Sequence, residues 1–290
     1  MADKEQNKVI DWGSPLGFCI AFLTIGFGIF SLSLDNPFDP VNDFTQFINI
    51  PSFAIVLGGT LAALIISLPL DALAGIPSVI AQAFQLNTFS YMDTINQILK
   101  WAEKGRKDGL LSLDNEIQTL PEGFLKKGME TAIIERDATK VKVFMLTEIN
   151  NISARHRAAQ DFFTKGEKFA PAFGMMGTVM GLVDMMNGFG AGGDGGGGGD
   201  LMQTMTGLLS GMGTALITTF YGVVLANFFF GPIAGKLQRL TSVELRHKNV
   251  ITEGVMSIHA REHPIIIRDK LMMFVPSAIR LSSSKAANKK

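Results

Sequence analysis

The chain has 290 residues, of which 47% are apolar and only 18% are charged, with 26 basic and 26 acidic side chains. So little charge favours a membrane protein over a soluble globular one, and a formal net charge of zero argues against a nucleic-acid partner. The single cysteine, Cys19, lies inside an apolar run, which excludes an internal disulfide and a thiolate metal site.

The first third of the chain contains two uncharged segments that are each long enough to cross a bilayer, for which about 20 apolar residues suffice. Residues 13–34 follow a short polar stretch, 1–12, that contains two lysines. A cleaved signal peptide is the alternative, but the run is longer than a typical signal core and no small-x-small cleavage site follows, so an uncleaved span is favoured. An acidic segment, 35–43, separates it from the second predicted span, 44–70.

Residues 71–167 have a different character, because charges return and apolar residues recur at helical spacing. The repeat is clearest at Ile95, Ile98, Leu99 and Ala102. The stretch 137–165 contains no proline and predicts a helix that leads into the next span. This part is expected to be a soluble helical insert, and residues 232–290 a second, mostly helical soluble segment with a disordered end.

Two further apolar runs, 168–189 and 201–231, flank the glycine-rich segment 190–200. Pro171 enters the first of these runs and Pro232 is predicted to end the second. Both runs carry small residues at helical spacing: Gly174, Gly177, Thr178 and Gly181 in the first, and Gly207, Gly211, Thr214, Thr218 and Gly222 in the second. Such faces let membrane helices approach closely, which predicts a tightly packed hairpin with its threonines facing protein.

Basic residues predict the orientation. Thirteen Lys and Arg lie in residues 71–168 and eleven lie after Pro232, whereas the segments 35–43 and 190–200 contain none. Both termini and the insert are therefore expected in the cytoplasm, with the two short loops outside.

Three motifs carry a resemblance to a known family: FAPAFGMMGTVMGL at 169–182, TTFYGVVLANFFFGPIAGKL at 218–237 and KGRKDGLLSL at 104–113. Together with the order of the spans, they resemble the MotA/PomA family of flagellar stator channel subunits over nearly the whole chain. The resemblance implies an all-α protein of the bacterial inner membrane with four spans, and no enzymatic activity. It also implies a ring, a pentamer around a dimer of a MotB/PomB-like single-span subunit anchored to peptidoglycan. Ion flow would turn this ring against a FliG-like rotor switch protein.

No predicted span has a charged residue near its middle, and Asp184 lies at the outer end of the third. An ion carrier needs an ionisable group in the membrane, so the essential carboxylate must come from a partner. The resemblance places Thr178, Thr218 and Thr219 on the path of the transported ion, which is Na⁺ or H⁺, with no cofactor. The threonine at position 178 makes the chain resemble the sodium-driven branch of the family. Threonine at position 219 occurs in both branches, so Thr219 does little to distinguish sodium from protons. The alternative is that each hydroxyl bonds only its own helix turn.

The resemblance also implies two further sets of functional residues. Pro171 and Pro232 match family prolines that couple conformational change in the channel to the cytoplasmic insert. The alternative is that each proline only starts or stops a helix. Arg106, Lys107 and Asp114 match rotor-contact charges, with glutamate more usual at the last position; Glu116 and Lys104 are further candidates. The alternative for these charges is a solvated helix face.

The segment 190–200 lacks the Lys-Ser/Thr of a phosphate loop and is expected to be a flexible external linker that binds no metal. Two other functions stay open. An ExbB/TolQ-like energiser of the cell envelope is disfavoured by four spans and the large insert, and a non-conducting membrane scaffold would share the same small-residue faces.

Overall fold

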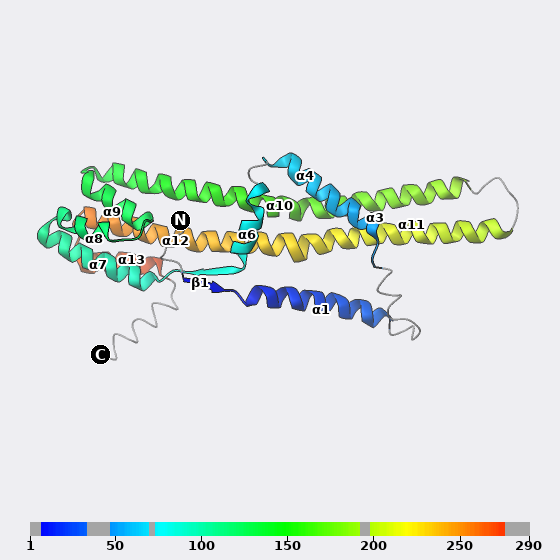
Figure 1. Cartoon of the computed structure of the whole chain (residues 1–290), viewed down its shortest axis with the longest axis horizontal. Coiled ribbons are helices and arrows are strands. Elements are labelled where there is room, and N and C mark those ends of the chain that lie inside the picture. The colour runs from blue at the N-terminus through cyan, green and yellow to red at the C-terminus, as the bar shows by residue number, and fades with distance from the viewer. Residues whose placement is uncertain (1–6, 34–46, 70–72, 192–197, 276–290) are drawn as a thin grey trace. The chain divides into compact units, whose positions relative to one another are not determined.

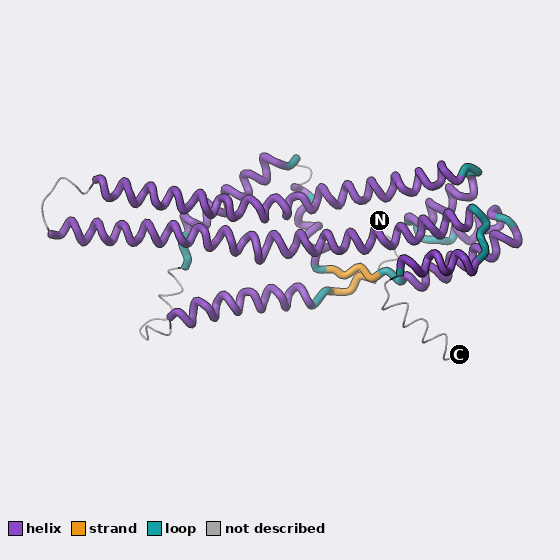
Figure 2. The backbone as a smooth tube through the Cα atoms, turned by 180° about the vertical axis from the view of Figure 1, so that it is seen from behind, coloured by secondary structure: helices purple, strands orange, loops and turns teal. Residues whose placement is uncertain are grey.

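The computed structural model describes residues 7–33, 47–69, 73–191 and 198–275, and groups the chain into two compact units. The membrane unit comprises residues 10–84 and 158–238, and the helical domain comprises 1–9, 85–157 and 239–290. Figures 1 and 2 show that helices make up almost all of the described chain. The predicted all-α class is confirmed, with one addition: strands β1 (Asn7–Ile10) and β2 (Gln85–Thr88) form a two-stranded sheet.

The membrane unit contains the predicted apolar helices. Its elements are α1 (Gly13–Ser33), α3 (Ile50–Phe53), the π-helical η1 (Ala54–Gly58), α4 (Gly59–Ser67), α6 (Ile76–Ala83), the second half of α10 (Ala138–Ala191), α11 (Gly198–Val224), the π-helical η3 (Leu225–Phe230) and the first turns of α12 (Gly231–His259). Four described helical stretches are long and apolar enough to span a bilayer: Gly13–Ser31, Ile50–Ser67, and one each within Ala138–Asn187 and Met205–His259. The four predicted spans therefore all have helical counterparts.

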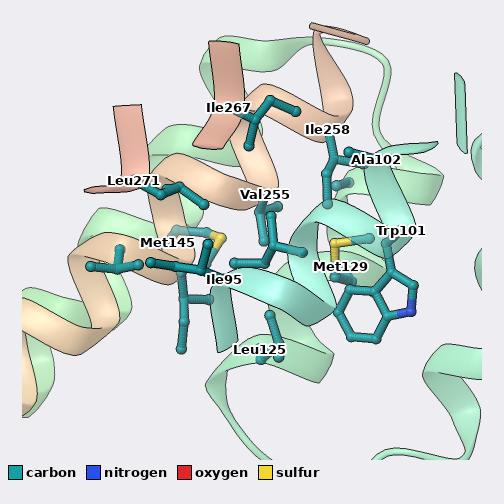
Figure 3. Packing of buried hydrophobic residues seen from close by; sticks show 14 of the residues in the cluster. Ile95, Trp101, Ala102, Leu125, Met129, Met145, Val255, Ile258, Ile267 and Leu271 are labelled. Carbon is teal, nitrogen blue, oxygen red and sulfur yellow. The ribbon is translucent and has the colours of Figure 1, made fainter. Parts of the chain in front are cut away.

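The helical domain joins the predicted insert and the segment after the fourth span into one hydrophobic core. Its helices are α7 (Tyr91–Asp108), the 3₁₀ segment η2 (Leu110–Leu113), α8 (Asp114–Gln118), α9 (Phe124–Ile134), the first half of α10, the rest of α12 and α13 (Pro264–Phe274). Figure 3 shows Ile95, Trp101 and Ala102 of α7 gathered with Val255 and Ile258 of α12. The helical repeat predicted in the insert is thus the buried face of α7. The sequence did not reveal that this face packs against α12, which lies about 150 residues later in the chain.

Glycine allows α7 and α12 to approach this closely. A Cβ atom on Gly254 would lie 2.5 Å from Cδ1 of Ile98, which real side chains do not tolerate. Gly128 of α9 is equally crowded, since a Cβ there would lie 2.6 Å from Cε of Met145 on α10. These two glycines therefore leave room for the Ile98 and Met145 side chains in the core of the domain.

The chain stays helical past Pro232, the residue at which the fourth apolar run ends. The chain is helical from Gly198 to His259, and Pro232 lies just after the π-helical segment η3. In η3 the Gly231 N–H donates to the carbonyl of Ala226, five residues earlier rather than four. This wider turn accommodates a residue that has no N–H of its own, so the helix passes the proline without terminating. Pro171 likewise lies inside α10.

His247 is a polar residue built into the core of the helical domain. Its side chain is 3% exposed and stacks on the ring of Phe89, with centroids 4.7 Å apart. The Thr94 hydroxyl donates its proton to the Ser90 carbonyl, so Nε2–H of His247 donates to Thr94 Oγ1 at 3.0 Å. Burial, and to a lesser degree the neighbouring Lys248 charge, lowers the pKa of His247 to about 4.

We expect the domain to lose stability in mild acid because of His247. Its pKa is about 4 when folded and about 6.5 when unfolded, so between these values the unfolded chain binds more protons. The free energy of unfolding then falls by up to about 3 kcal/mol as the pH drops from 6.5 to 4. Thermal unfolding of the full chain in detergent, followed across this range, measures the fall, and His247→Gln should reduce it.

The matched control for that experiment is His263→Gln, because His263 is exposed at the N-terminus of α13. It should leave the pH dependence unchanged. If His247→Gln lost as much stability between pH 6.5 and 4 as the parent does, groups other than His247 would cause the loss.

Candidate functional site

The third and fourth apolar helices, α10 and α11, pack along their small residues in the membrane unit, and they run side by side in Figure 1. A Cβ on Gly222 would lie 2.7 Å from the carbonyl oxygen of Ala170 and 3.1 Å from Cα of Gly174. At the next level, a Cβ on Gly177 would lie 2.7 Å from Cβ of Thr218. The predicted close-packed hairpin is confirmed, and its closest contacts are between backbones.

The three candidate threonines lie on α10 and α11 in different surroundings. Thr218 is fully buried against Gly177, and its hydroxyl donates to the carbonyl of Ala215 at 2.7 Å. Thr178 is half-buried and donates to the carbonyl of Met175 at 2.6 Å. Thr219 is also half-buried, with its Cα near Gly174 across the contact. The hydroxyls of Thr178 and Thr218 both donate their proton, so both oxygens keep lone pairs that can accept. Of these two oxygens, the one on Thr178 belongs to the less buried side chain.

The two candidate prolines lie at different levels of the same helix pair. A Cβ on Gly222 would come within 3.2 Å of Cα of Pro171, and Pro232 follows the π-helical segment of the opposite helix. Phe230 of that segment is 2% exposed and fills the space above Gly166, where a Cβ would be 2.4 Å from the ring. π-Helical turns are rare and occur often at functional sites. The prolines therefore bracket an irregular section of a tightly packed helix pair.

Two side chains from these helices hold the second span, and neither contact could be recognised from the sequence pattern. The Tyr221 hydroxyl accepts from the backbone N–H of Asn49 at 2.9 Å and donates to the carbonyl of Phe47. At the other end of the span, Lys165 Nζ donates to the carbonyl of Ser67 at 3.1 Å. A cation there satisfies a terminal carbonyl and the negative end of the helix dipole. Both ends of the helical stretch 50–67 are thus fixed to the α10–α11 pair.

The candidate rotor charges fall into two groups in the helical domain. Lys104 Nζ lies 2.6 Å from Oε1 of Glu116, and the indole N–H of Trp101 donates to Oε2 of the same carboxylate at 3.1 Å. The hydrogen bond from Lys104 is the main reason why the pKa of Glu116 lies below its usual value. Lys104 and Glu116 are therefore engaged with each other and brace α7 against α8.

Arg106 and Lys107 form the second group, exposed in the last turn of α7. Within the described ranges neither makes an ion pair. Asp114 begins α8, and its carboxylate accepts a hydrogen bond from the Gln118 side chain of the same helix at 3.1 Å. Gly109, with φ +85° and ψ 160°, ends α7 in a conformation that is essentially restricted to glycine and turns the chain into η2. The turn thus brings two exposed basic side chains and one carboxylate onto adjacent helices.

Most of the glycine-rich segment lies outside the described residues. Helix α10 extends to Ala191 and α11 begins at Gly198, so residues 192–197 separate them. The predicted acidic segment 35–43 is also outside the described part, as is the C-terminal end beyond residue 275.

Comparisons with known proteins agree with this architecture. A profile of the MotA/TolQ/ExbB proton channel family matches residues 116–249. The uncharacterized protein YtxD of Bacillus subtilis is 36% identical over 267 residues, 92% of this chain and 91% of that protein. Motility protein A of Treponema pallidum is 32% identical over 232 residues, 80% of this chain and 85% of its own length.

A solved structure described as the flagellar MotAB stator complex from Bacillus subtilis has the same fold. It superimposes with a TM-score of 0.75 at 25% identity, over 94% of this chain and 99% of the matched chain. These similarities extend through the apolar helices and the helical domain alike. The chain therefore belongs to the MotA/TolQ/ExbB proton channel family, in its MotA/PomA branch.

Proposed function

We propose that this protein is the ion-channel and torque-generating subunit of a bacterial flagellar stator. The observation that carries the proposal is similarity along nearly the whole chain to proteins named motility protein A, joined to the fold of a MotAB stator. The chain is proposed to work with a MotB/PomB-like subunit and as an oligomer, with a pentamer around a partner dimer as the proposed stoichiometry. The lack of a mid-span carboxylate in this sequence supports that division of labour, because the partner then supplies the ion-binding acid.

The proposed topology puts both termini and residues 71–167 in the cytoplasm, with segments 35–43 and 190–200 in the periplasm. The distribution of lysine and arginine supports it, since the two short segments have none. The protein would then lie in the inner membrane with its helical domain facing the rotor.

Thr178, Thr218 and Thr219 are proposed to line the ion pathway between this chain and its partner. The accessible oxygen of Thr178 supports sodium as the transported ion, because sodium takes hard oxygen ligands and needs more of them than one carboxylate provides. Thr218 is buried and would act by fixing the spacing of α10 and α11. The family profile is described as a proton channel, so the alternative ion is H⁺.

Coupling and rotor contact are assigned to separate residues. Pro171 and Pro232 are proposed to pass movement from the pathway to the helical domain, and the π-helical turn before Pro232 supports a deformable helix there. Arg106, Lys107 and Asp114 are the proposed contacts with the FliG-like rotor protein, since Arg106 and Lys107 are exposed and complementary charges steer association. Lys104 and Glu116 would support that surface through their own ion pair.

The test is the swimming speed of a stator-deleted host that expresses this chain with its partner. Sodium is varied at a fixed proton-motive force, and a protonophore is then added. Speed that rises with sodium and survives the protonophore identifies a sodium stator. Speed that ignores sodium and stops with the protonophore identifies a proton stator. No motility, with both subunits present in the membrane, would contradict the proposed function.

A further inference from the structure

The membrane unit contains a cavity of about 360 Å³ at the beginning of α1. One face of α1, the end of α6, and the helix around Pro232 line it. The volume is within the range of ligand pockets, about 300–1,000 Å³. The family match and the proposed stator function do not assign any role to this cavity.

The cavity exists because α1 presents small residues to it. Gly13, Gly17 and Ala21 recur four residues apart and so lie on one side of the helix. A Cβ on Gly17 would meet nothing within 4 Å, so the space beside it is open. Phe18 and Phe84, with ring centroids 6.1 Å apart, form part of an apolar wall. This part of the cavity suits a hydrocarbon chain.

One end of the cavity is polar, because Ser14 and Lys236 line it, and the Asp11 carboxylate lies just beside it as the ion-pair partner of Lys236. Lys236 Nζ contacts the Asp11 carboxylate and the Ser14 hydroxyl, and the backbone N–H of Asp11 donates to the carbonyl of Phe84 at 3.2 Å. The two charged side chains are each 19% exposed, so both remain reachable. Asp11 lies just before the apolar helix, where a bilayer interface is expected.

The surroundings indicate the source of a ligand. Phe22, Leu23 and Phe27 of α1 are each about 70% exposed within this chain, and α1 carries no charge. Side chains of that kind face lipid or another membrane helix, not water. An amphipathic molecule with a polar end at Asp11 and Lys236 and an apolar part along Gly17 matches what a bilayer supplies.

We propose that this cavity binds a zwitterionic phospholipid of the phosphatidylethanolamine type. Its ammonium would pair with Asp11 and its phosphate with Lys236, while one acyl chain lies along Gly17 and Ala21. A purely anionic lipid would bring its phosphate against the Asp11 carboxylate without a compensating ammonium. Bound lipid would fill the space between α1 and the helix at Pro232 and hold them together.

Native mass spectrometry of the full-length oligomer, extracted in mild detergent, tests this directly. Phosphatidylethanolamine and phosphatidylglycerol are added in competition, and retained lipid is counted per chain. We expect one phosphatidylethanolamine per chain in the parent. Gly17→Leu should lower that occupancy at least fivefold, because leucine fills the cavity. Gly28→Leu is the matched control, since Gly28 is on the same helix, also has open space and does not line the cavity.

A second variant tests the headgroup separately from the cavity. Asp11→Asn keeps Lys236 but removes the partner of the ammonium, so selectivity should shift at least fivefold towards phosphatidylglycerol. Three results would overturn the proposal: equal retention in the Gly17→Leu and Gly28→Leu variants, preference of the parent for phosphatidylglycerol, or no change of selectivity in Asp11→Asn. A Gly17→Leu variant with an altered oligomer mass and unchanged lipid would instead assign the cavity to a neighbouring subunit.

Discussion

Replacement of Gly222 by leucine is expected to abolish the folded membrane unit, and with it all motility. A Cβ at this position would lie 2.7 Å from the carbonyl oxygen of Ala170 and about 3.1 Å from Cα of Gly174. Both neighbours are backbone atoms, so no change of rotamer relieves the contact and the two helices must separate. Overpacking by a methylene or two costs about 1–3 kcal/mol, and a whole isobutyl group against backbone should cost at least the upper value.

Thermal unfolding of the full chain in detergent measures this effect, together with its abundance in the membrane. Gly213→Leu is the matched control on the same helix, because a Cβ there meets nothing within 4 Å. It should unfold at the temperature of the parent. Gly222→Ala should fall between the two, since it adds one methyl group. If Gly222→Leu unfolded like its control and supported swimming, the described α10–α11 contact would be incorrect.

The fold of the membrane unit was accessible from sequence because its signals are local. Uncharged runs of sufficient length predict spans, and small residues at helical spacing predict which faces meet. Gly174, Gly177 and Gly222 all lie at the contact that this spacing indicated. Local patterns could not show that Tyr221 and Lys165 fix the ends of the second span. Those hydrogen bonds join residues about 170 and 100 positions apart.

The helical domain was predicted only in part, for the same reason. The repeat at Ile95 and Ile98 marks a buried face but not what covers it, and the cover comes from α12 and α13 near the end of the chain. Sequence reasoning also treated Lys104 and Glu116 as separate candidates. The turn at Gly109 brings them to 2.6 Å, because only glycine readily adopts that backbone conformation.

The fourth apolar run ends at Pro232, but the helix continues past it. Pro232 in an ideal α-helix would leave a carbonyl without its donor and would clash with the preceding turn, which justifies expecting a stop. The π-helical segment η3 removes that conflict over six residues, and nothing in the composition LANFFF distinguishes it from ordinary helix. The proposed coupling role therefore concerns a deformable helix and not a helix end.

Replacement of Thr178 by alanine is expected to raise the sodium concentration for half-maximal swimming speed about tenfold. The Thr178 hydroxyl gives its proton to the Met175 carbonyl, so the lone pairs of its oxygen stay available at a half-buried position. The loss of one oxygen ligand worth about 1.4 kcal/mol corresponds to a tenfold change in affinity. The effect should appear at low sodium and vanish at saturation, because the packing of α10 on α11 does not depend on this side chain.

Two variants separate ion binding from packing. Thr178→Ser keeps the hydroxyl and loses a methyl group, so its half-maximal sodium should stay within about twofold of the parent, well under 1 kcal/mol. Thr24→Ala is the control for a back-bonded hydroxyl in another apolar helix, since Thr24 of α1 donates to the carbonyls of Ile20 and Ala21 and is exposed. A Thr178→Ala variant that lost speed equally at every sodium concentration would assign Thr178 to packing. One that kept full speed and unchanged sodium dependence would remove it from the pathway, and the ion would then be bound by the partner's carboxylate and backbone carbonyls alone.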